Sequence, residues 1–271
     1  YDQRVSFFMN EVSRFFHLSS TDLINPPLIH ILPLTSTISL ESGNPALSIN
    51  EAIKSRSKMN VSINENDLTT ANFDNLEGDA RIKVLEAGLK RTKCDDLEKI
   101  ITRSSSSIVN WAQRRNQYVG TLATKCITGY VIGVENRLLS NIMMCSESAR
   151  VYNVYFKHCF NESNTPLPFR LTRILTNALD AAGKKGAIRI SMKRTLKGIR
   201  DNSDTLLTTL SASIHDEGLN WTAKKEDAVS YLKKSLFESD LSVDDEVDYL
   251  IKAATAKENL LQMTSEWNPL L

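Results

Sequence analysis

The sequence is poor in the features that mark several protein classes. It has four cysteines, Cys94, Cys126, Cys145 and Cys159, and none of them stands in a C-x-x-C spacing. A zinc site and a disulfide framework are therefore disfavoured, and a reducing compartment is expected. No apolar run approaches the roughly 20 residues needed to span a bilayer, so we expect no transmembrane segment. The formal net charge is +1, so no overall field attracts nucleic acid and no such partner is expected.

Motifs of common enzyme sites are missing as well. The sequence contains no G-x-S-x-G, no H-E-x-x-H and no G-x-G-x-x-G, and its histidines, His17, His30, His158 and His215, are scattered. These absences argue against a serine hydrolase, a zinc protease and a glycine-rich nucleotide loop within the chain. The chain begins at Tyr1 rather than Met, so we expect it to be an excerpt of a longer protein.

Helical periodicity is the main pattern that is present. Hydrophobic residues make up 41% of the 271 residues, enough for one sizeable core or two unequal ones. Helices are expected in 1–18, from Ser48 onward with a serine cap, and in 73–89, 94–101, 108–133, 184–200 and 206–214. Strands are expected in 28–34, 37–41, 138–144 and 151–160, a loop in 60–72 and a linker in 104–107. The fold class is therefore mainly α with a few short β-strands.

Residues 126–172 carry the most specific motifs. An apolar helix leads into a polar loop, two apolar segments that turn at 146–149, and a long connection ending in Pro168-Phe169-Arg170-Leu171-Thr172. This stretch resembles the phosphatidylinositol-3-kinase-related protein kinases, whose catalytic loop reads G-Y-x-x-G-x-G-D-R-H-x-x-N and whose activation segment closes with P-F-R-L-T. The second motif is matched in full, and the first is matched at Gly129, Tyr130, Gly133, Arg137 and Asn141.

Further matches favour the TOR (target of rapamycin) type of that family. Trp111-x-x-Arg114-Arg115, the string 173–183 and the stretch 247–271 resemble TOR, and the last resembles the FATC tail with Trp267 near its end. The resemblance implies a protein-kinase-like (PI3/PI4-kinase type) C-lobe helical bundle. It places the C-helix and the hinge between lobes in 1–47, the C-lobe in 48–221, a polar linker or insert in 222–240 and the FATC tail in 241–271.

The positions that carry chemistry in the family differ here. Its catalytic aspartate falls on Asn136, its histidine on Leu138 and its metal-binding aspartate on Tyr155. Asn136 is not a base, and Asn141 is at most a metal ligand through its amide oxygen, whereas Mg²⁺ sites usually use one or two carboxylates. General-base positioning alone contributes roughly 10²–10⁴-fold. We therefore expect a pseudokinase that binds the family's ATP and Mg weakly or not at all and acts as a scaffold or regulator in TOR-type growth signalling.

Two alternatives stay open. One is an active ATP-dependent serine/threonine kinase with relocated acidic residues, which predicts that Glu135 or Glu147 faces the phosphates. The other is a TRRAP-like transcription scaffold, which shares the P-F-R-L-T segment and a tryptophan–proline tail. The string after Thr172 favours TOR over this second alternative.

The resemblance also implies protein partners. TOR docks a small WD40-propeller subunit through the region equivalent to 48–72, for which a solvated insertion is the alternative. In the tail, Trp267 with Leu270 and Leu271 suggests a peripheral membrane contact. The expected location is cytoplasmic, with the surface of endomembranes and the nucleus as alternatives.

The segment 184–200 combines an apolar and a basic stripe. It holds seven basic residues and no acidic one. The apolar stripe is Ile188, Met192, Leu196 and Ile199, and the basic stripe one position on is Arg189, Lys193, Lys197 and Arg200. We expect a C-lobe helix with a solvated basic face, and a calmodulin-like or lipid-binding helix is the alternative.

Overall fold

The computed structural model describes residues 30–33, 39–42, 46–57, 76, 78–91, 93–135, 137–154, 159–160, 166–214, 225–237 and 239–263. Helices dominate these residues, which confirms the predicted fold class. The strands are β1 (His30–Pro33), β2 (Ser39–Ser42), β3 (Ala46–Ser48), β4 (Ile142–Cys145) and β5 (Val151–Asn153). The α-helices are α2 (Ile49–Ser57), α4 (Gly78–Arg91), α5 (Asp96–Arg103), α6 (Ile108–Val131), α7 (Arg173–Asn177), α8 (Ala187–Asp201), α9 (Ser203–Ile214), α10 (Lys225–Phe237), α11 (Val243–Thr255) and α12 (Lys257–Leu260). Two short 3₁₀ turns are η2 (Leu139–Asn141) and η3 (Gly183–Lys185).

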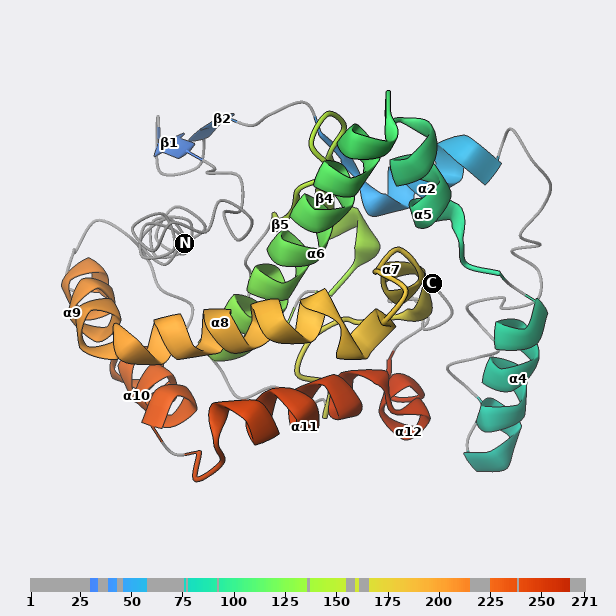
Figure 1. The fold of residues 1–271 in the computed structure, drawn as a ribbon. Helices are drawn as coiled ribbons and strands as arrows, with labels where there is room; N and C mark the ends of the chain where they lie inside the picture. The colour runs from blue at the N-terminus through green and yellow to red at the C-terminus, as the bar shows by residue number, and fades with distance from the viewer. Residues whose placement is uncertain are drawn as a thin grey trace.

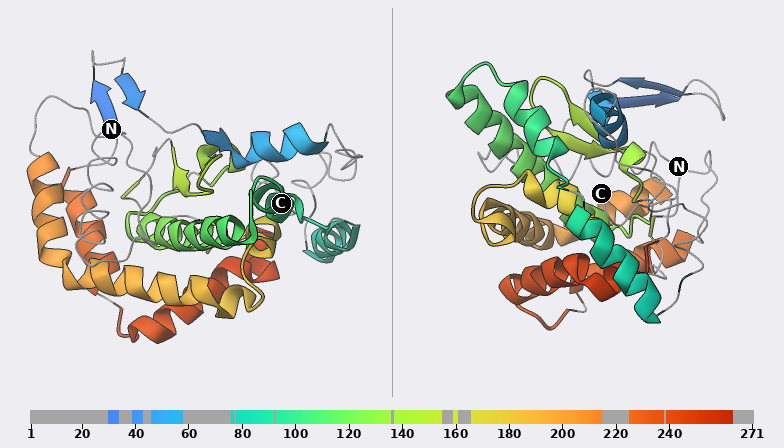
Figure 2. Two further views of the ribbon diagram at one scale, coloured as in Figure 1. Left: turned by 45° about the horizontal axis from the view of Figure 1, so that its top comes forward. Right: turned by 90° about the vertical axis from the view of Figure 1, so that its right-hand side faces the viewer.

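Helix α6 lies in the middle of the molecule (Figure 1). On one side it packs against β5, with the small sheet β3–β4–β5 and α2 beyond, and on the other side it packs against α8. Helix α11 covers α8 from outside, so the order across the molecule is sheet, α6, α8 and α11 (Figure 2). Burying one large apolar side chain contributes roughly 1.5–3 kcal/mol. A helix covered on both sides therefore needs the nearly continuous apolar sequence that α6 has in its C-terminal half.

Helix α6 starts as the sequence predicts. Ser107 is its N-cap, and the Oγ of this serine accepts a hydrogen bond from the amide of Asn110 at 3.1 Å. The first residues, Ile108 and Val109, are exposed, whereas every residue from Tyr118 to Gly129 is buried. The helix therefore enters the core only after its third turn.

The two predicted strand pairs are both present. β1 and β2 are antiparallel with His30 opposite Ser42, and β4 and β5 form an antiparallel hairpin with Met143 opposite Tyr152. Strand β3 was not predicted, because its three residues pair only with β4, which is remote in the sequence. The predicted serine cap of α2 is confirmed as a reciprocal pair: Ser48 Oγ accepts from the amide of Glu51, and Glu51 Oε2 accepts from the amide of Ser48, each at 3.1 Å.

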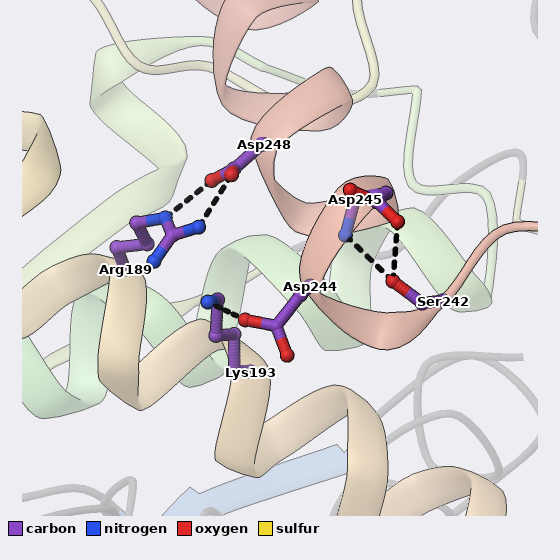
Figure 3. Close-up of polar contacts among 6 residues, drawn as sticks. All are labelled: Arg189, Lys193, Ser242, Asp244, Asp245 and Asp248. Carbon is purple, nitrogen blue, oxygen red and sulfur yellow. Dashed lines mark hydrogen bonds and ion pairs between the residues drawn. The ribbon is translucent and has the colours of Figure 1, made fainter.

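Helix α8 confirms the apolar stripe and corrects the prediction for the basic one. All four residues of the apolar stripe are buried. The expected solvated face is wrong for three of the four cations, which pair with acidic residues of α11: Arg189 with Asp248, Lys193 with Asp244 and Arg200 with Glu246. Figure 3 shows Arg189 and Lys193 reaching from α8 to α11. We call these three pairs the α8–α11 seam. Its acids come from a helix more than 40 residues away in sequence, so the stripe alone could not reveal them.

The segment predicted as a polar linker, 222–240, contains helix α10. Ala228, Leu232 and Leu236 of this helix are buried in the main core. These three residues are spaced as on one face of a helix. The helix was not predicted because the many lysines around them make the segment look polar. Ser235 Oγ also donates to the carbonyl of Val131 at 3.0 Å, which connects α10 to the last turn of α6.

A second, smaller core joins α4 to the C-terminal helices. It consists of Leu85, Leu167, Leu260 and Met263, with Leu89 and other side chains packed around them. Arg81 donates to the carbonyl of Met263 at 3.0 Å, and Lys257 pairs with Glu86 at 2.8 Å. The chain thus has two unequal cores, one of the two outcomes that its composition allowed.

Several predicted features lie outside the described residues. They are the helix 1–18, the loop 60–72, the positions Asn136 and Tyr155, and Trp267. Within the described ranges, no helix is both long enough and apolar enough to cross a membrane.

Candidate functional site

The last turn of α6 positions the equivalent of the catalytic loop. The amide of Gly133 donates to the carbonyl of Tyr130 at 3.1 Å, and the amide of Val134 donates to the carbonyl of Gly129 at 2.8 Å. These two bonds form a Schellman motif, whose turning residue takes a positive φ, and Gly133 has φ 65°. A side chain there would cost roughly 1–2 kcal/mol. The motif glycine at 133 therefore ends α6 and sends the chain into the loop at a fixed angle.

Backbone hydrogen bonds hold the loop against the hairpin and against the segment after it. Leu138 begins the turn η2, and the carbonyl of Leu138 accepts from the amide of Asn141 at 3.1 Å. The carbonyl of Asn141 accepts from the amide of Val154 at 2.9 Å, and Phe160 donates from its amide to the carbonyl of Ile132 at 2.7 Å. The frame that presents the catalytic and metal loops in the family is thus built here from main-chain contacts.

Arg170 connects the end of the activation segment to this loop. It is buried, and its Nη1 donates to the carbonyl of Arg137 at 3.0 Å while its Nε donates to Thr172 Oγ1 at 3.3 Å. The Cys126 thiol on α6 lies 3.9 Å from the carbonyl of Arg170. Burial lowers the pKa of Arg170 to about 9. The segment Pro168–Thr172 is therefore fixed to α6 and to the loop at one buried guanidinium.

Two further cations lie near Arg170. Burial lowers the pKa of Arg137 to about 10, and the charge of Glu135 opposes that shift. Lys125 in α6 is also buried, and its pKa is lowered by burial and by the positive charges of Arg170 and Arg137. Sequence reasoning missed Lys125, although a lysine in the middle of the apolar run 118–131 was the available signal. Arg170, Arg137 and Lys125 therefore concentrate buried positive charge next to the catalytic-loop equivalent.

The predicted site residues are only partly placed. Leu138 and Asn141 flank η2 at the mouth of the hairpin, and Pro168–Thr172 runs beside them through Arg170. Asn136 and Tyr155, the positions of the family's two aspartates, lie outside the described residues. The assigned roles of these residues therefore stay predictions.

The predicted metal positions offer a poor donor set for the Mg²⁺ ions that phosphoryl transfer uses. The family's metal positions hold the amide of Asn141 and the phenol of Tyr155, whereas Mg²⁺ prefers carboxylate oxygens. Among the described residues there is no group of three His, Cys, Asp or Glu side chains able to hold a metal. The buried cations next to the loop would also repel a metal ion rather than attract it.

The small core gives the activation segment a second support. Leu167, directly before the P-F-R-L-T motif, is buried against Leu85 of α4 and against Leu260 and Met263 of the C-terminal helices. Arg173, directly after the motif, donates to the carbonyl of Leu89 in α4. Both ends of the motif thus contact elements that are remote in sequence.

Known proteins match this arrangement. The family model described as phosphatidylinositol 3- and 4-kinase matches residues 35–223. The serine/threonine-protein kinase mTor of Drosophila melanogaster is 34% identical over 176 residues, which cover 61% of this chain and 7% of that protein. Serine/threonine-protein kinase TOR of Arabidopsis thaliana is 32% identical over 155 residues, which cover 55% of this chain and 6% of that protein.

Solved structures share the fold. The open conformation of CtTel1 superposes with a TM-score of 0.87 at 22% identity and covers 100% of this chain and 11% of that one. The FAT and kinase domain of CtTel1 gives a TM-score of 0.86 at the same identity, covering 100% of this chain and 21% of that one. The chain spans only 6 to 7% of the length of the TOR relatives. Because the family model covers more than half of the 271 residues and the loop frame is present, the chain belongs to the phosphatidylinositol 3- and 4-kinase family, with a kinase region similar to that of the TOR serine/threonine kinases.

Proposed function

We propose that this chain is the C-lobe region of a TOR-related kinase whose phosphotransfer is impaired, and that it acts as a regulator or scaffold. The observation that carries the proposal is that the residues that shape the family's site are kept, whereas the residues expected to do its chemistry are replaced. The frame of the family is kept at Gly133, Arg137 and Arg170, while the positions of the two aspartates hold Asn136 and Tyr155.

The physical reason lies in the charges of phosphoryl transfer. This reaction needs an oriented nucleophile and neutralisation of the phosphate charge, chiefly by Mg²⁺ held on carboxylates. An asparagine at 136 orients a hydroxyl without accepting its proton, and a tyrosine at 155 brings no anionic metal ligand. The predicted result is weak binding of ATP with Mg²⁺ and turnover at or near background.

The alternative is an active kinase that uses relocated acidic residues, and neither candidate, Glu135 or Glu147, is well placed for that role. Glu147 lies in the turn beyond β4, about 13 Å of strand away from Asn141 at ~3.3 Å per residue, and its carbonyl accepts from Arg114. Glu135 lies in the loop, where its charge compensates buried Arg137. A carboxylate whose charge stabilises a buried guanidinium is less available to a metal ion, which favours Glu135 as a structural residue.

The remaining parts of the proposal follow the TOR likeness. Helices α11 and α12 would correspond to the FATC tail, and 48–72 would dock a WD40-propeller subunit of a TOR-type complex. The proposed location is the cytoplasm or the surface of endomembranes. The TRRAP-like alternative has less support, because the TOR relatives match at up to 34% identity through the kinase region.

Mg²⁺-dependent transfer from ATP to a generic serine/threonine substrate tests the proposal. The parent protein is compared with the double variant Asn136→Asp/Tyr155→Asp, and nucleotide binding by both is measured by calorimetry. We expect the parent at background, and a gain in the double variant would show that the frame is competent. Lys197→Gln, at an exposed position of α8, serves as the control for changes of charge remote from the loop.

Turnover by the parent at an ordinary kinase rate, on the order of 1 per second or more, would overturn the proposal. In that case Glu135→Gln decides the alternative. If a relocated Glu135 carries the chemistry, the variant loses activity, whereas Glu147→Gln at the far end of the hairpin does not.

A further inference from the structure

The tip of the β4–β5 hairpin places a thiol in an unusual polar environment. Cys145 is the last residue of β4, and its backbone closes the turn: its amide donates to the carbonyl of Arg150 and its carbonyl accepts from the amide of Ala149, each at 2.9 Å. The residue is 4% exposed, but the next two residues, Ser146 and Glu147, are exposed. The thiol is therefore one short turn away from solvent.

The turn that follows Cys145 affects the pKa of its thiol. Burial alone would raise the pKa of Cys145, but hydrogen bonds from the Ser148 hydroxyl and from the amides of Ser148 and Glu147 outweigh it, so the pKa is lower than usual. By contrast, burial raises the pKa of the Cys126 thiol to about 11. Hydrogen bonds donated to a sulfur stabilise its anionic form. The thiolate form is therefore more accessible at Cys145 than at Cys126.

A buried guanidinium next to the turn has a free edge. Arg114 of α6 is 5% exposed, and its Nη1 donates to the carbonyls of Glu147 at 3.0 Å and Ser104 at 3.2 Å. Its Nε and Nη2, which together form the other edge of the guanidinium, have no acceptor within the described residues. Burial lowers the pKa of Arg114, and the charge of Cys145 opposes this. Buried donors without a partner are rare in folded proteins, so this edge is an unexplained feature of the hairpin.

We propose that Cys145 is a site of reversible oxidation to a sulfenate, whose oxygen is held by the free edge of Arg114. An oxygen added to the sulfur supplies the acceptor that the guanidinium lacks. Charge-assisted bonds of this kind are stronger than neutral ones. The inference does not depend on the proposed function, because it concerns the hairpin tip and not the loop at its other end.

The chemical step needs a hydroperoxide as the oxidant. The thiolate sulfur attacks one peroxide oxygen, so that an S–O bond forms as the O–O bond breaks. The leaving hydroxide or alkoxide takes the proton of the new S–OH group, which gives the sulfenate and water or an alcohol; the sulfur loses two electrons and the peroxide is reduced. A small thiol reverses the change: it forms a mixed disulfide with release of water, and a second thiol then frees Cys145.

Oxidation would tie the hairpin more firmly to α6. The hairpin carries the residues that follow the catalytic-loop equivalent, and Arg114 is a buried residue of the N-terminal half of α6. The sulfenate would add a second contact to Arg114 at the hairpin tip, beside the bond to the carbonyl of Glu147, while Thr121 Oγ1 of α6 already accepts from the amide of Val151 at 2.9 Å further along the hairpin. The strength with which the hairpin is held against α6 would therefore depend on the peroxide concentration.

The experiment compares the cysteines within one protein. The protein is treated with equimolar hydrogen peroxide, sulfenates are trapped with dimedone, and the occupancy of each cysteine is measured by peptide mass spectrometry. Cys94 is the internal control, since it has the same exposed fraction of 4%. We expect at least about fivefold more label on Cys145 than on Cys94, and reversal by a thiol added before dimedone.

Two variants test the partners. Arg114→Lys keeps the charge and removes the free edge, so the sulfenate should persist for a shorter time. Ser148→Ala removes one donor to the sulfur at a half-buried turn position that tolerates the change, and it should slow the labelling of Cys145 about two- to threefold. Equal labelling of Cys94 and Cys145 in the parent overturns the proposal, and an unchanged sulfenate lifetime in folded Arg114→Lys overturns the role of the arginine. If Arg114→Lys does not fold, the result with Ser148→Ala decides by itself.

Discussion

The buried cations below the loop and the α8–α11 seam use the same residue types in opposite ways. Arg170 and Arg137 are buried, and Arg170 is bonded to a backbone carbonyl and a threonine hydroxyl. In the seam, Arg189 and Lys193 reach carboxylates of α11 that are largely exposed. Removing a charge from water costs several kcal/mol, whereas exposed pairs contribute about 0–1 kcal/mol each. The comparison teaches that the loop frame depends on specific buried groups, while the exposed pairs of the seam add little to the apolar stripe beneath them.

The largest effect is expected at Arg170. Arg170→Ala removes the bonds to the carbonyl of Arg137 and to Thr172, leaves these acceptors buried and opens a cavity. We expect a loss of about 3 kcal/mol in the free energy of unfolding, measured by urea denaturation. Lys197→Ala, an exposed cation on α8, is the control and should change stability by less than about 0.5 kcal/mol. Equal losses in the two variants would contradict the distinction between buried and exposed cations.

A second pair of variants divides the seam itself. Glu246 is 2% exposed and pairs with Arg200, whereas the Asp244 side chain, on the same helix, is 66% exposed and pairs with Lys193. Glu246→Ala leaves Arg200 partly buried without this partner, and we expect a loss of about 2 kcal/mol. Asp244→Ala should cost under about 1 kcal/mol. If both variants behave alike in urea denaturation, burial does not decide the strength of these pairs.

An intermediate effect is expected where η3 leads into α8. Asp180 Oδ2 accepts from the amide of Ala187, and a Cβ added to Gly186 would lie 2.3 Å from Asp180 Oδ1 and 2.8 Å from the Cβ of Ala182. Gly186→Ala should therefore displace this cap and cost about 1 kcal/mol, read from the thermal midpoint. Gly129→Ala is the control, because its new Cβ would meet Val134 at an ordinary 3.8 Å. A larger loss at 129 than at 186 would contradict the prediction.

The smallest effect, and the one that depends on solution conditions, is expected at Asp248. Hydrogen bonds from Arg189 lower the pKa of the Asp248 carboxyl, while burial opposes this slightly. A lowered pKa means that the pair stabilises the fold above the usual value of 3.8 and that this contribution disappears as the pH falls through the folded-state pKa. Asp248→Asn should lower the thermal midpoint by at most about 2 °C at pH 7 and low salt.

The same variant should not differ from the parent at pH 2 or in 1 M salt, where the Debye length is about 3 Å. A difference that persists under both conditions would mean that Asp248 acts through packing rather than through charge.

Much of the fold could be predicted from local pattern. The start of α6 at Ile108, the capping of α2 by Ser48, the β4–β5 hairpin and the apolar stripe of α8 were each predicted from spacing or from a capping residue. Strand β3 and helix α10 were missed, the first because three residues carry no period and the second because its apolar face lies among lysines. The candidate site was predicted from its resemblance to the family's motifs. The roles assigned to Asn136 and Tyr155 remain predictions.

The sequence by itself determined the family frame, since glycine at 133 and the string Pro168–Thr172 are needed wherever this backbone turns and packs. It also predicts which acids are missing, at Asn136 and Tyr155, because the identity of a residue at a matched position is read from sequence alone. Only the tertiary structure decided where the basic residues go: Arg189, Lys193 and Arg200 to α11, Arg170 to the loop, and Arg114 to the hairpin with one edge left free. The physical reason is that a long cationic side chain is compatible with solvent, an ion pair or a buried carbonyl, and the choice depends on which remote element the folded chain brings within reach.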